Sequence, residues 1–363
     1  MANTAKPKTD RDLPDLPDLE DYVAGVDRIL HPLCSHASAL PRPKLPAPRS
    51  PLSLMSLEQK NWFKMAFQVQ GSVIPTIASR VLCCGAFGLF ISALAFYQIP
   101  VSAKVLGGVV PSIVLGLLLV FRTNTAYERF WEGRKAWGSI VNNIRNLARL
   151  IWVAITEVDP IHRYEKEEIL KLLVAFAVAT KLHLRSQPVD DRLAELVSPV
   201  QFSKLQVMNN PPLEIVFWIS DYLQAKHEQS QISTYQMNEL QSILHGLVDM
   251  LGACERILRT PIPLAYVIHL KQLLLIYCLL LPFQVVDELK WWTAPVVALV
   301  SFTLFGIEAI GVEIENPFGT DPNDLPLDTI CNTIERNIDD LISIEPHYRR
   351  AGMYGSGLGE QLN

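Results

Sequence analysis

The ionisable side chains of this chain are not arranged for catalysis. Its 8 histidines are scattered without the spacing of metal ligands, and its 6 cysteines include no CxxC pair that would suit zinc. No Gly-rich phosphate loop, HExxH or GxSxG motif occurs. The charged residues that stand out instead lie at the ends of apolar stretches, and they are Arg122, Arg129, Glu308, Glu313 and Glu315. Such charges act on passing ions or stabilise one another, so we expect no enzyme, no catalytic residue and no cofactor.

These charges would favour opposite ions if they faced a pore. The two arginines would attract anions, whereas the three glutamates would attract cations. Glu308 is the most unusual of them, because a carboxylate inside an apolar stretch is by default a functional candidate. A structural ion pair of Glu308 with Arg80 or Lys271 is an equally good interpretation.

A stripe of aliphatic residues precedes Arg122. Val109, Ile113 and Leu117 lie four residues apart, and this spacing puts them on one face of a helix. If several copies of the helix surrounded an axis, the stripe would form stacked apolar rings, which gate ion flow by expelling water. In a single chain the same stripe would face lipid or the chain's own core, and spacing does not decide between these alternatives.

The composition indicates a membrane protein with a large part outside the bilayer. Hydrophobic residues make up 49% of the 363 residues and charged residues only 19%. The mean hydropathy is +0.20. This charged fraction is lower than in ordinary soluble domains. The net charge of −5 argues against a nucleic-acid partner and leaves membrane lipid as an expected one.

Four apolar stretches could enter a bilayer, at residues 81–97, 105–121, 272–286 and 291–312. Short connections join the first to the second and the third to the fourth, which predicts two helical hairpins. Residues 122–150 hold six Lys or Arg and two acids, and short basic segments stay on the cytoplasmic side. Both termini are therefore expected on the cytoplasmic or stromal side.

The chain divides by pattern into five segments, all helical where they are ordered, so we predict an all-α fold with four membrane helices and a helical cytosolic domain. We expect a disordered Pro-rich segment (1–55), an interfacial helix with the first membrane hairpin (56–121) and a cytosolic helical domain (122–258). The second membrane hairpin (259–315) and a cytosolic C-terminal helix with its tail (316–363) follow.

Three motifs of this sequence resemble the bestrophin family. VPSIVLGLLLVFRTNTAYERFWEGRKAWGSIVNNIRNLAR is similar to its second transmembrane region and the helix that follows. RTPIPLAYVIHLKQLLLIYCLLLPF (259–283) is similar to its segment that re-enters the membrane, and FGIEAIGVEIENPFGTDPNDLPLD (305–328) to its end-of-membrane motif. The resemblance covers roughly residues 58 to 345 and is closest to the bacterial, cyanobacterial and plastid branch.

The resemblance implies a homopentameric ion channel with one central pore. The family's neck residues fall on Val109, Ile113 and Leu117, and its cytosolic aperture falls on Ile262. Animal members carry Phe in the neck, whereas all three positions here are aliphatic. Animal members also bind calcium after the Asn-Pro-Phe-Gly turn.

The calcium-binding run is interrupted in this chain. Asn316, Asp321 and Asp324 stand at matching places, but Pro322 and Asn323 lie between them. Calcium takes six to eight oxygen ligands, so these residues are at best an incomplete calcium site.

The sequence therefore predicts a channel for chloride, with bicarbonate and nitrate as further candidate ions, in a plasma or thylakoid membrane. Two alternatives stay open. One is a monovalent cation channel of the same fold, since no neck residue is charged. The other is a membrane scaffold that conducts nothing.

Overall fold

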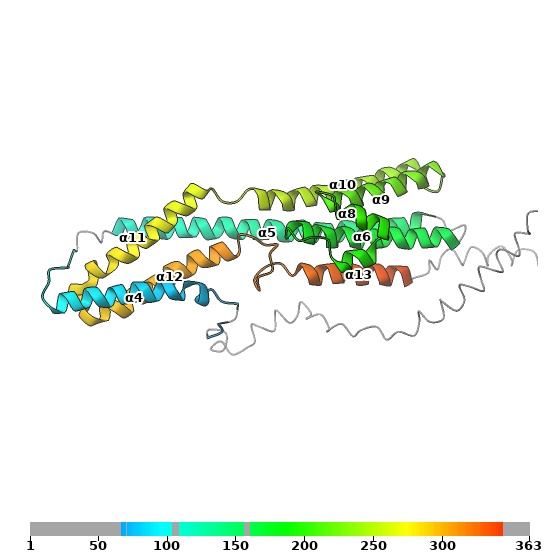
Figure 1. The fold of residues 1–363 in the computed structure, drawn as a ribbon. Helices are drawn as coiled ribbons and strands as arrows, with labels where there is room; N and C mark the ends of the chain where they lie inside the picture. Colours follow the sequence, from blue (N-terminus) through cyan, green and yellow to red (C-terminus); the bar gives the residue numbers. More distant parts are fainter. Residues whose placement is uncertain (1–66, 70, 104–108, 156–159, 344–363) are drawn as a thin grey trace, which may run out of the picture. The chain divides into compact units, whose positions relative to one another are not determined.

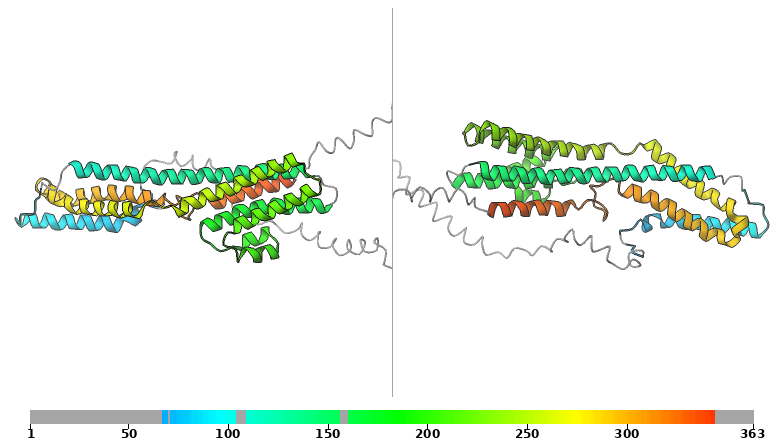
Figure 2. Two further views of the ribbon diagram at one scale, coloured as in Figure 1. Left: turned by 90° about the horizontal axis from the view of Figure 1, so that it is seen from above. Right: turned by 180° about the vertical axis from the view of Figure 1, so that it is seen from behind.

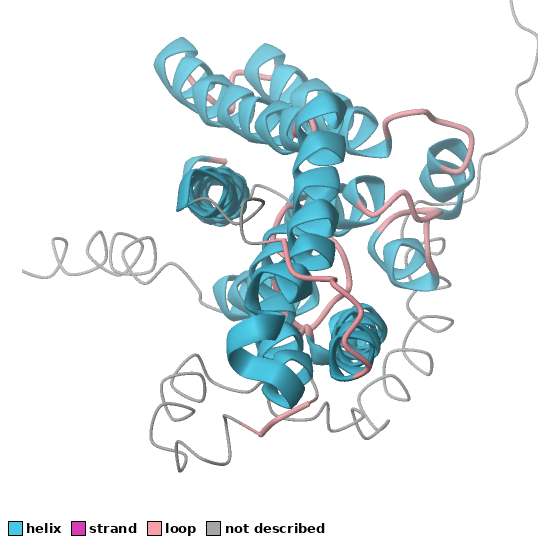
Figure 3. Ribbon diagram, turned by 90° about the vertical axis from the view of Figure 1, so that its left-hand side faces the viewer, coloured by secondary structure: helices cyan, strands magenta, loops and turns pink. Residues whose placement is uncertain are grey.

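The computed structural model describes residues 67–69, 71–103, 109–155 and 160–343 (Figure 1). Every regular element in these ranges is a helix (Figure 3), as predicted. The expected disordered segment 1–55, almost all of the expected interfacial helix 56–67, and the tail from residue 344 lie outside the described residues. The helices are α4 (Ile74–Phe96), α5 (Val109–Ala154), α6 (Pro160–Leu184), α7 (Asp191–Leu196), α8 (Pro199–Leu205), α9 (Pro211–Glu228), α10 (Thr234–Arg259), α11 (Leu264–Leu289), the 3₁₀ turn η2 (Lys290–Trp292), α12 (Thr293–Glu313) and α13 (Leu327–Ser343).

Three stretches of the described chain are long and apolar enough to cross a membrane: Ile74–Phe96, Val110–Ala154 and Leu264–Glu313. The third contains both α11 and α12, which η2 separates. Lys290 begins that turn with a positive φ of 49°, a conformation that ends α11. The predicted second hairpin is therefore present as two packed helices.

The helices extend further than the apolar stretches predicted. α4 begins at Ile74 instead of residue 81, and α11 begins at Leu264 instead of residue 272. The sequence prediction was too short because Arg80 and Lys271 interrupt the hydropathy, although they do not interrupt the helices. Likewise, α5 passes through Arg122 without a break, and the whole helix has 46 residues.

One buried cluster joins α4, α11, α12 and the first part of α5. Ile77, Leu119, Leu274 and Val297 are among its members. α4 and α12 approach closely because Gly88 faces Ala294, and a Cβ on that glycine would lie 3.2 Å from the Ala294 Cα. Small residues at such a contact are typical of helices that pack within a membrane.

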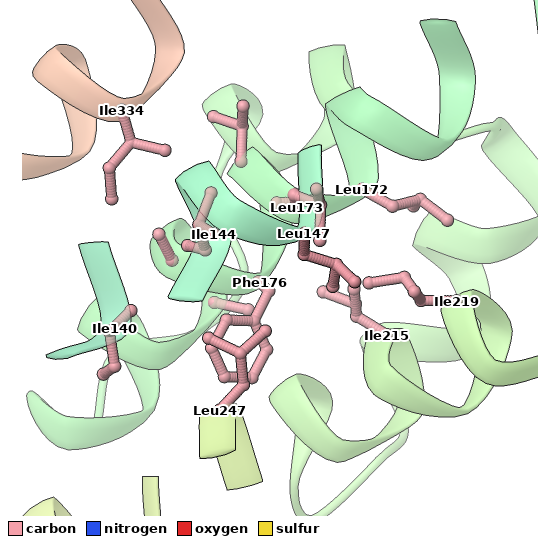
Figure 4. Close-up of a cluster of buried hydrophobic side chains, with 14 of the residues drawn as sticks. Ile140, Ile144, Leu147, Leu172, Leu173, Phe176, Ile215, Ile219, Leu247 and Ile334 are labelled. Carbon is pink, nitrogen blue, oxygen red and sulfur yellow. The ribbon is translucent and has the colours of Figure 1, made fainter. Parts of the chain in front are cut away.

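A second buried cluster surrounds the rest of α5 with α6, α9, α10 and α13 (Figure 4). In Figure 4, Ile144 and Leu147 of α5 lie among Phe176, Leu247 and the other labelled aliphatic side chains. α5 thus contributes to both clusters, and both views of Figure 2 show it running past both groups of helices. A single straight element therefore connects the two packed regions.

The end of α5 is held by a buried lysine. Lys166 Nζ donates hydrogen bonds to the carbonyl oxygens of Trp152 (2.9 Å) and Ile155 (3.1 Å) and lies 4.6 Å from the centre of the Trp152 ring. Carbonyls of a last helical turn lack partners within the helix and carry partial negative charge. The Lys166 charge is therefore compensated where it is buried, and α5 is fixed to α6.

Candidate functional site

The aliphatic stripe of α5 faces away from the chain's own core. The Ile113 and Leu117 side chains are 63% and 53% exposed, whereas Leu115 and Leu119 on the opposite side of the helix are buried. The core alternative is therefore wrong for Ile113 and Leu117. The backbone of Val109 begins α5, but its side chain lies outside the described residues. An apolar face this exposed needs lipid or another chain against it.

Arg122 lies on the buried face of α5, at the level where the stripe ends. Its side chain is 2% exposed, and its Nη2 donates a 2.6 Å hydrogen bond to Glu315 Oε2, just after α12. Its other terminal nitrogen, Nη1, is buried and has no hydrogen-bond partner in the part of the chain that the structure describes. The Arg122 charge is therefore compensated mainly by Glu315.

Glu315 also holds the connection between α10 and α11. Its Oε1 accepts a 3.2 Å hydrogen bond from the backbone N–H of Ile262. Burial by itself would raise the pKa of the Glu315 carboxyl, but the hydrogen bonds from Arg122 and from Ile262 outweigh it and hold that pKa below its ordinary value. The carboxylate therefore links α5, the end of α12 and the predicted aperture residue.

Arg129 completes this arrangement about two helical turns after Arg122 along α5. Its Nε donates to the backbone carbonyl of Glu315 (3.2 Å), and its two terminal nitrogens donate to the carbonyls of Ile257 and Thr260. A guanidinium suits this role because its five N–H groups have a fixed geometry. Arg129 therefore fixes the last turn of α10 and the segment that carries Ile262, which is partly buried.

In the sequence, Arg122, Arg129 and Glu315 stood out as separate charges at the ends of apolar stretches. The structure brings them together as an aperture clamp, a name we use for these three residues and their contacts to the backbone at 257–262. Arg122 and Glu315 are 193 residues apart, and their spacing gives no signal of the contact. The one available signal was that each follows an apolar stretch.

Tyr266 makes a contact with α5 that the sequence did not predict. Its hydroxyl donates a 2.6 Å hydrogen bond to the backbone carbonyl of Leu118, next to the stripe residue Leu117. Tyr266 lies one turn after Ile262, so α11 joins the stripe level of α5 to the predicted aperture. A displacement of α5 at the stripe would therefore also move the segment that carries Ile262.

The remaining acids are also engaged within the chain. Glu308 is buried, with its carboxylate 3.8 Å from Arg80 Nη1 and 3.9 Å from Lys271 Nζ, which confirms the pairing alternative. Asn323 donates a 2.6 Å hydrogen bond to Glu313 Oε1. The hypothesis that Glu308 faces a pore is wrong, because its side chain lies inside the chain.

The predicted calcium residues close a tight loop. Asn316 Oδ1 accepts from the Phe318 N–H (3.3 Å), and Asp324 Oδ2 accepts from the Asp321 N–H (2.7 Å). Gly319 is required here, because a Cβ would lie 2.5 Å from Asp324 Oδ2. Burial, followed by the charges of neighbouring acids, raises the pKa of Asp324 above its ordinary value, which is opposite to the effect of a favourable cationic partner.

One amide and two carboxylates, partly used by backbone N–H groups, do not supply the six to eight oxygens of a calcium site. No group of three or more His, Cys, Asp or Glu in the described ranges could hold a metal ion. The loop instead docks on α5, where Pro317 and Phe318 lie against Gly133.

Comparisons with known proteins agree with the motifs. A model of the bacterial and fungal bestrophin proteins matches residues 55–340. The chain is 64% identical over 309 residues to a voltage-dependent anion channel-forming protein of Nostoc sp., covering 85% of this chain and 99% of that one. It is 57% identical over 288 residues to a protein of the same description from Synechocystis sp., covering 79% and 94%.

A solved structure has the same fold. The crystal structure of a bacterial bestrophin homologue from Klebsiella pneumoniae superimposes with a TM-score of 0.69 at 29% sequence identity. The match covers 74% of this chain and 100% of that one.

Proposed function

Because this chain belongs to the bestrophin family, we propose that it forms an anion channel, with chloride as the main permeant ion and bicarbonate and nitrate as further ones. The anion preference is supported by the name that its cyanobacterial relatives carry. The same chain is an integral membrane protein that crosses the bilayer several times and has no enzymatic role.

The observation that carries the proposal is the exposed aliphatic stripe on α5. Ile113 and Leu117 point away from the core of the chain, on a helix that is long enough to cross a bilayer. In a pentamer, α5 of each copy would face the axis, and Val109, Ile113 and Leu117 would form three apolar rings. Such rings repel water and hence hydrated ions, so the neck is the gate.

A second constriction lies at Ile262 in this proposal. The aperture clamp holds the N–H of this residue through Glu315 and the segment before it through the carbonyls of Ile257 and Thr260, which Arg129 binds. A rigid apolar ring at this point discriminates among anions by how readily each sheds water. In this proposal the neck opens and closes the channel, and the aperture determines which anions pass.

The acids give the cation-channel alternative little support, because Glu308 is buried and Glu315 is paired with Arg122. Arg122 and Arg129 are held within the chain in the same way, so they do not favour anions by themselves. The anion preference therefore rests on the relatives, and the reversal potential decides between the two ions. The non-conducting scaffold remains a possible result of the test that ends the Discussion.

We place four helices in the membrane: α4, the first part of α5, α11 and α12. The basic segment 122–150 then lies on the cytoplasmic or stromal side, together with both termini. Residues 122–258 form the helical domain on that side, and residues 316–363 add α13 and the tail to it. The membrane is a plasma membrane or a thylakoid membrane.

The assembly is the part of this proposal that is simplest to measure. In native mass spectrometry from mild detergent, we expect one species of five chains, each of 40.7 kDa. The physical reason is that the exposed stripe and the other apolar surfaces of α5 gain contacts in the ring. A monomer or dimer as the dominant species, in protein that keeps its helical circular dichroism, would contradict the pentamer.

A further inference from the structure

A pocket lies between α4, α11 and α12 and takes no part in the proposed pore. Its volume is about 500 Å³. Most of its lining is apolar, and three charged side chains, Arg80, Lys271 and Glu308, also line it. The apolar part includes Cys83, Leu274, Leu275, Leu279 and Phe305. The pocket therefore has a charged part and an apolar part.

The charged part has an excess of positive charge. The Glu308 side chain is 5% exposed, whereas those of Arg80 and Lys271 are 50% and 56% exposed. One carboxylate cannot neutralise two cations. Both contacts, at 3.8 and 3.9 Å, are also longer than the 2.7–2.9 Å of a charge-assisted hydrogen bond. N–H donors of both cations are thus available to an anionic ligand.

The three charges lie near the ends of their helices, from which long side chains reach the lipid headgroups. Arg80 lies about 9 Å along α4 from its first residue, and Lys271 about 10 Å along α11, at a rise of 1.5 Å per residue. Glu308 is about 8 Å from the end of α12. All three helix ends are those nearest to the basic segment of α5. Long cationic side chains at such a depth extend toward phosphate groups at the interface.

The apolar part of the pocket continues from this level toward the middle of the bilayer. Leu274, Leu275 and Leu279 follow Lys271 along α11, and Leu275 and Leu279 are themselves exposed. A free inorganic anion would gain nothing from such a surface. An acyl chain would cover it.

From this combination we infer that the pocket binds an anionic phospholipid of the leaflet that faces the basic segment. The phosphate lies between Arg80 and Lys271, and one acyl chain lies along Leu274, Leu275 and Phe305. Basic pockets between membrane helices on the cytoplasmic side are a known way of holding anionic headgroups. The ligand also offsets the positive charge that Glu308 leaves uncompensated.

The test uses the full-length protein in detergent, with native mass spectrometry and added phosphatidylglycerol or phosphatidylcholine. We expect wild-type protein to retain phosphatidylglycerol at least tenfold more than phosphatidylcholine. The variant Arg80→Gln/Lys271→Gln/Glu308→Gln removes all three charges without leaving an unpaired carboxylate, and it should lose this preference. Arg134→Gln/Lys135→Gln removes the same two cation types elsewhere and should behave like wild type.

A second variant separates a lipid from a free anion. Cys83→Phe fills the apolar part of the pocket and leaves Arg80 and Lys271 in place, so it should reduce phosphatidylglycerol retention about tenfold. The inference is overturned if the triple variant keeps the wild-type preference, if both lipids are retained equally by wild type, or if Cys83→Phe has no effect. Equal binding of inorganic phosphate by wild type and Cys83→Phe, with no lipid retained, would also overturn it. No ion current is measured, so a failure here leaves the proposed channel untouched.

Discussion

Replacing Val109, Ile113 and Leu117 together by alanine raises the open probability of the channel severalfold. In the proposed pentamer these residues form three apolar rings about 6 Å apart along the axis, since four residues of a helix rise about 1.5 Å each. An ion in a narrow apolar ring must shed water without gaining oxygen ligands, so the closed state is favoured. Alanine widens and wets each ring. Single-channel recording of purified protein in a planar bilayer measures the change.

The matched control changes another exposed side chain of the same helix. Val114 is also exposed but does not follow the four-residue spacing of the stripe, so Val114→Ala should leave the open probability near wild type. Ile262→Ala should instead change the relative permeability among anions. Unchanged closed times in the triple alanine variant, in protein that still runs as a pentamer, would show that the stripe faces lipid.

Replacing Glu315 by alanine lowers the free energy of unfolding by about 3 kcal/mol, the usual cost of removing one partner of a buried ion pair. The Arg122 guanidinium is 2% exposed and would lose its compensating charge. The Ile262 N–H would lose its acceptor at the same time, so we also expect altered permeability ratios. Thermal unfolding in detergent, followed by circular dichroism, measures the stability change.

Two further variants show whether the loss comes from the unpaired charge. Arg122→Met/Glu315→Ala removes both charges and should recover most of the stability. Glu168→Ala breaks the exposed pair with Lys171 and should cost less than about 1 kcal/mol. A double variant no more stable than Glu315→Ala would contradict the assignment of Glu315 as the partner of Arg122.

The contribution of Glu315 also depends on pH in a defined direction. Because its folded-state pKa lies below the ordinary value, the carboxylate stabilises the fold fully at any pH above that ordinary value. The contribution is lost as the pH falls through the folded-state pKa. The stability difference between wild type and Glu315→Ala should therefore shrink in acid and be constant near neutral pH.

The sequence predicted the helical class and the second hairpin because long apolar stretches leave few other structures possible in a bilayer. It also placed Ile113 and Leu117 on one face of a helix, since helical spacing determines which residues share a face, but the exposure of that face came from the structure. The family predicted from three motifs is confirmed by the match over residues 55–340.

What the sequence could not supply were the partners of the charges. Arg80 and Lys271 limited the predicted apolar stretches, yet α4 and α11 extend through them, and the Glu308 carboxylate lies 3.8 and 3.9 Å away. Arg122 follows the second apolar stretch directly, and no spacing in the sequence indicates that Glu315 accepts its hydrogen bond. These partners come from distant segments, so only the packing of α4, α5, α11 and α12 reveals them.

Ion selectivity tests the account most directly. Purified protein in a planar bilayer, with a gradient of potassium chloride across the membrane, gives a reversal potential. We expect this potential to lie close to the chloride equilibrium potential and to shift when chloride is replaced by a large impermeant anion. A reversal at the potassium equilibrium potential, or no current at all from protein that is pentameric, would contradict an anion channel.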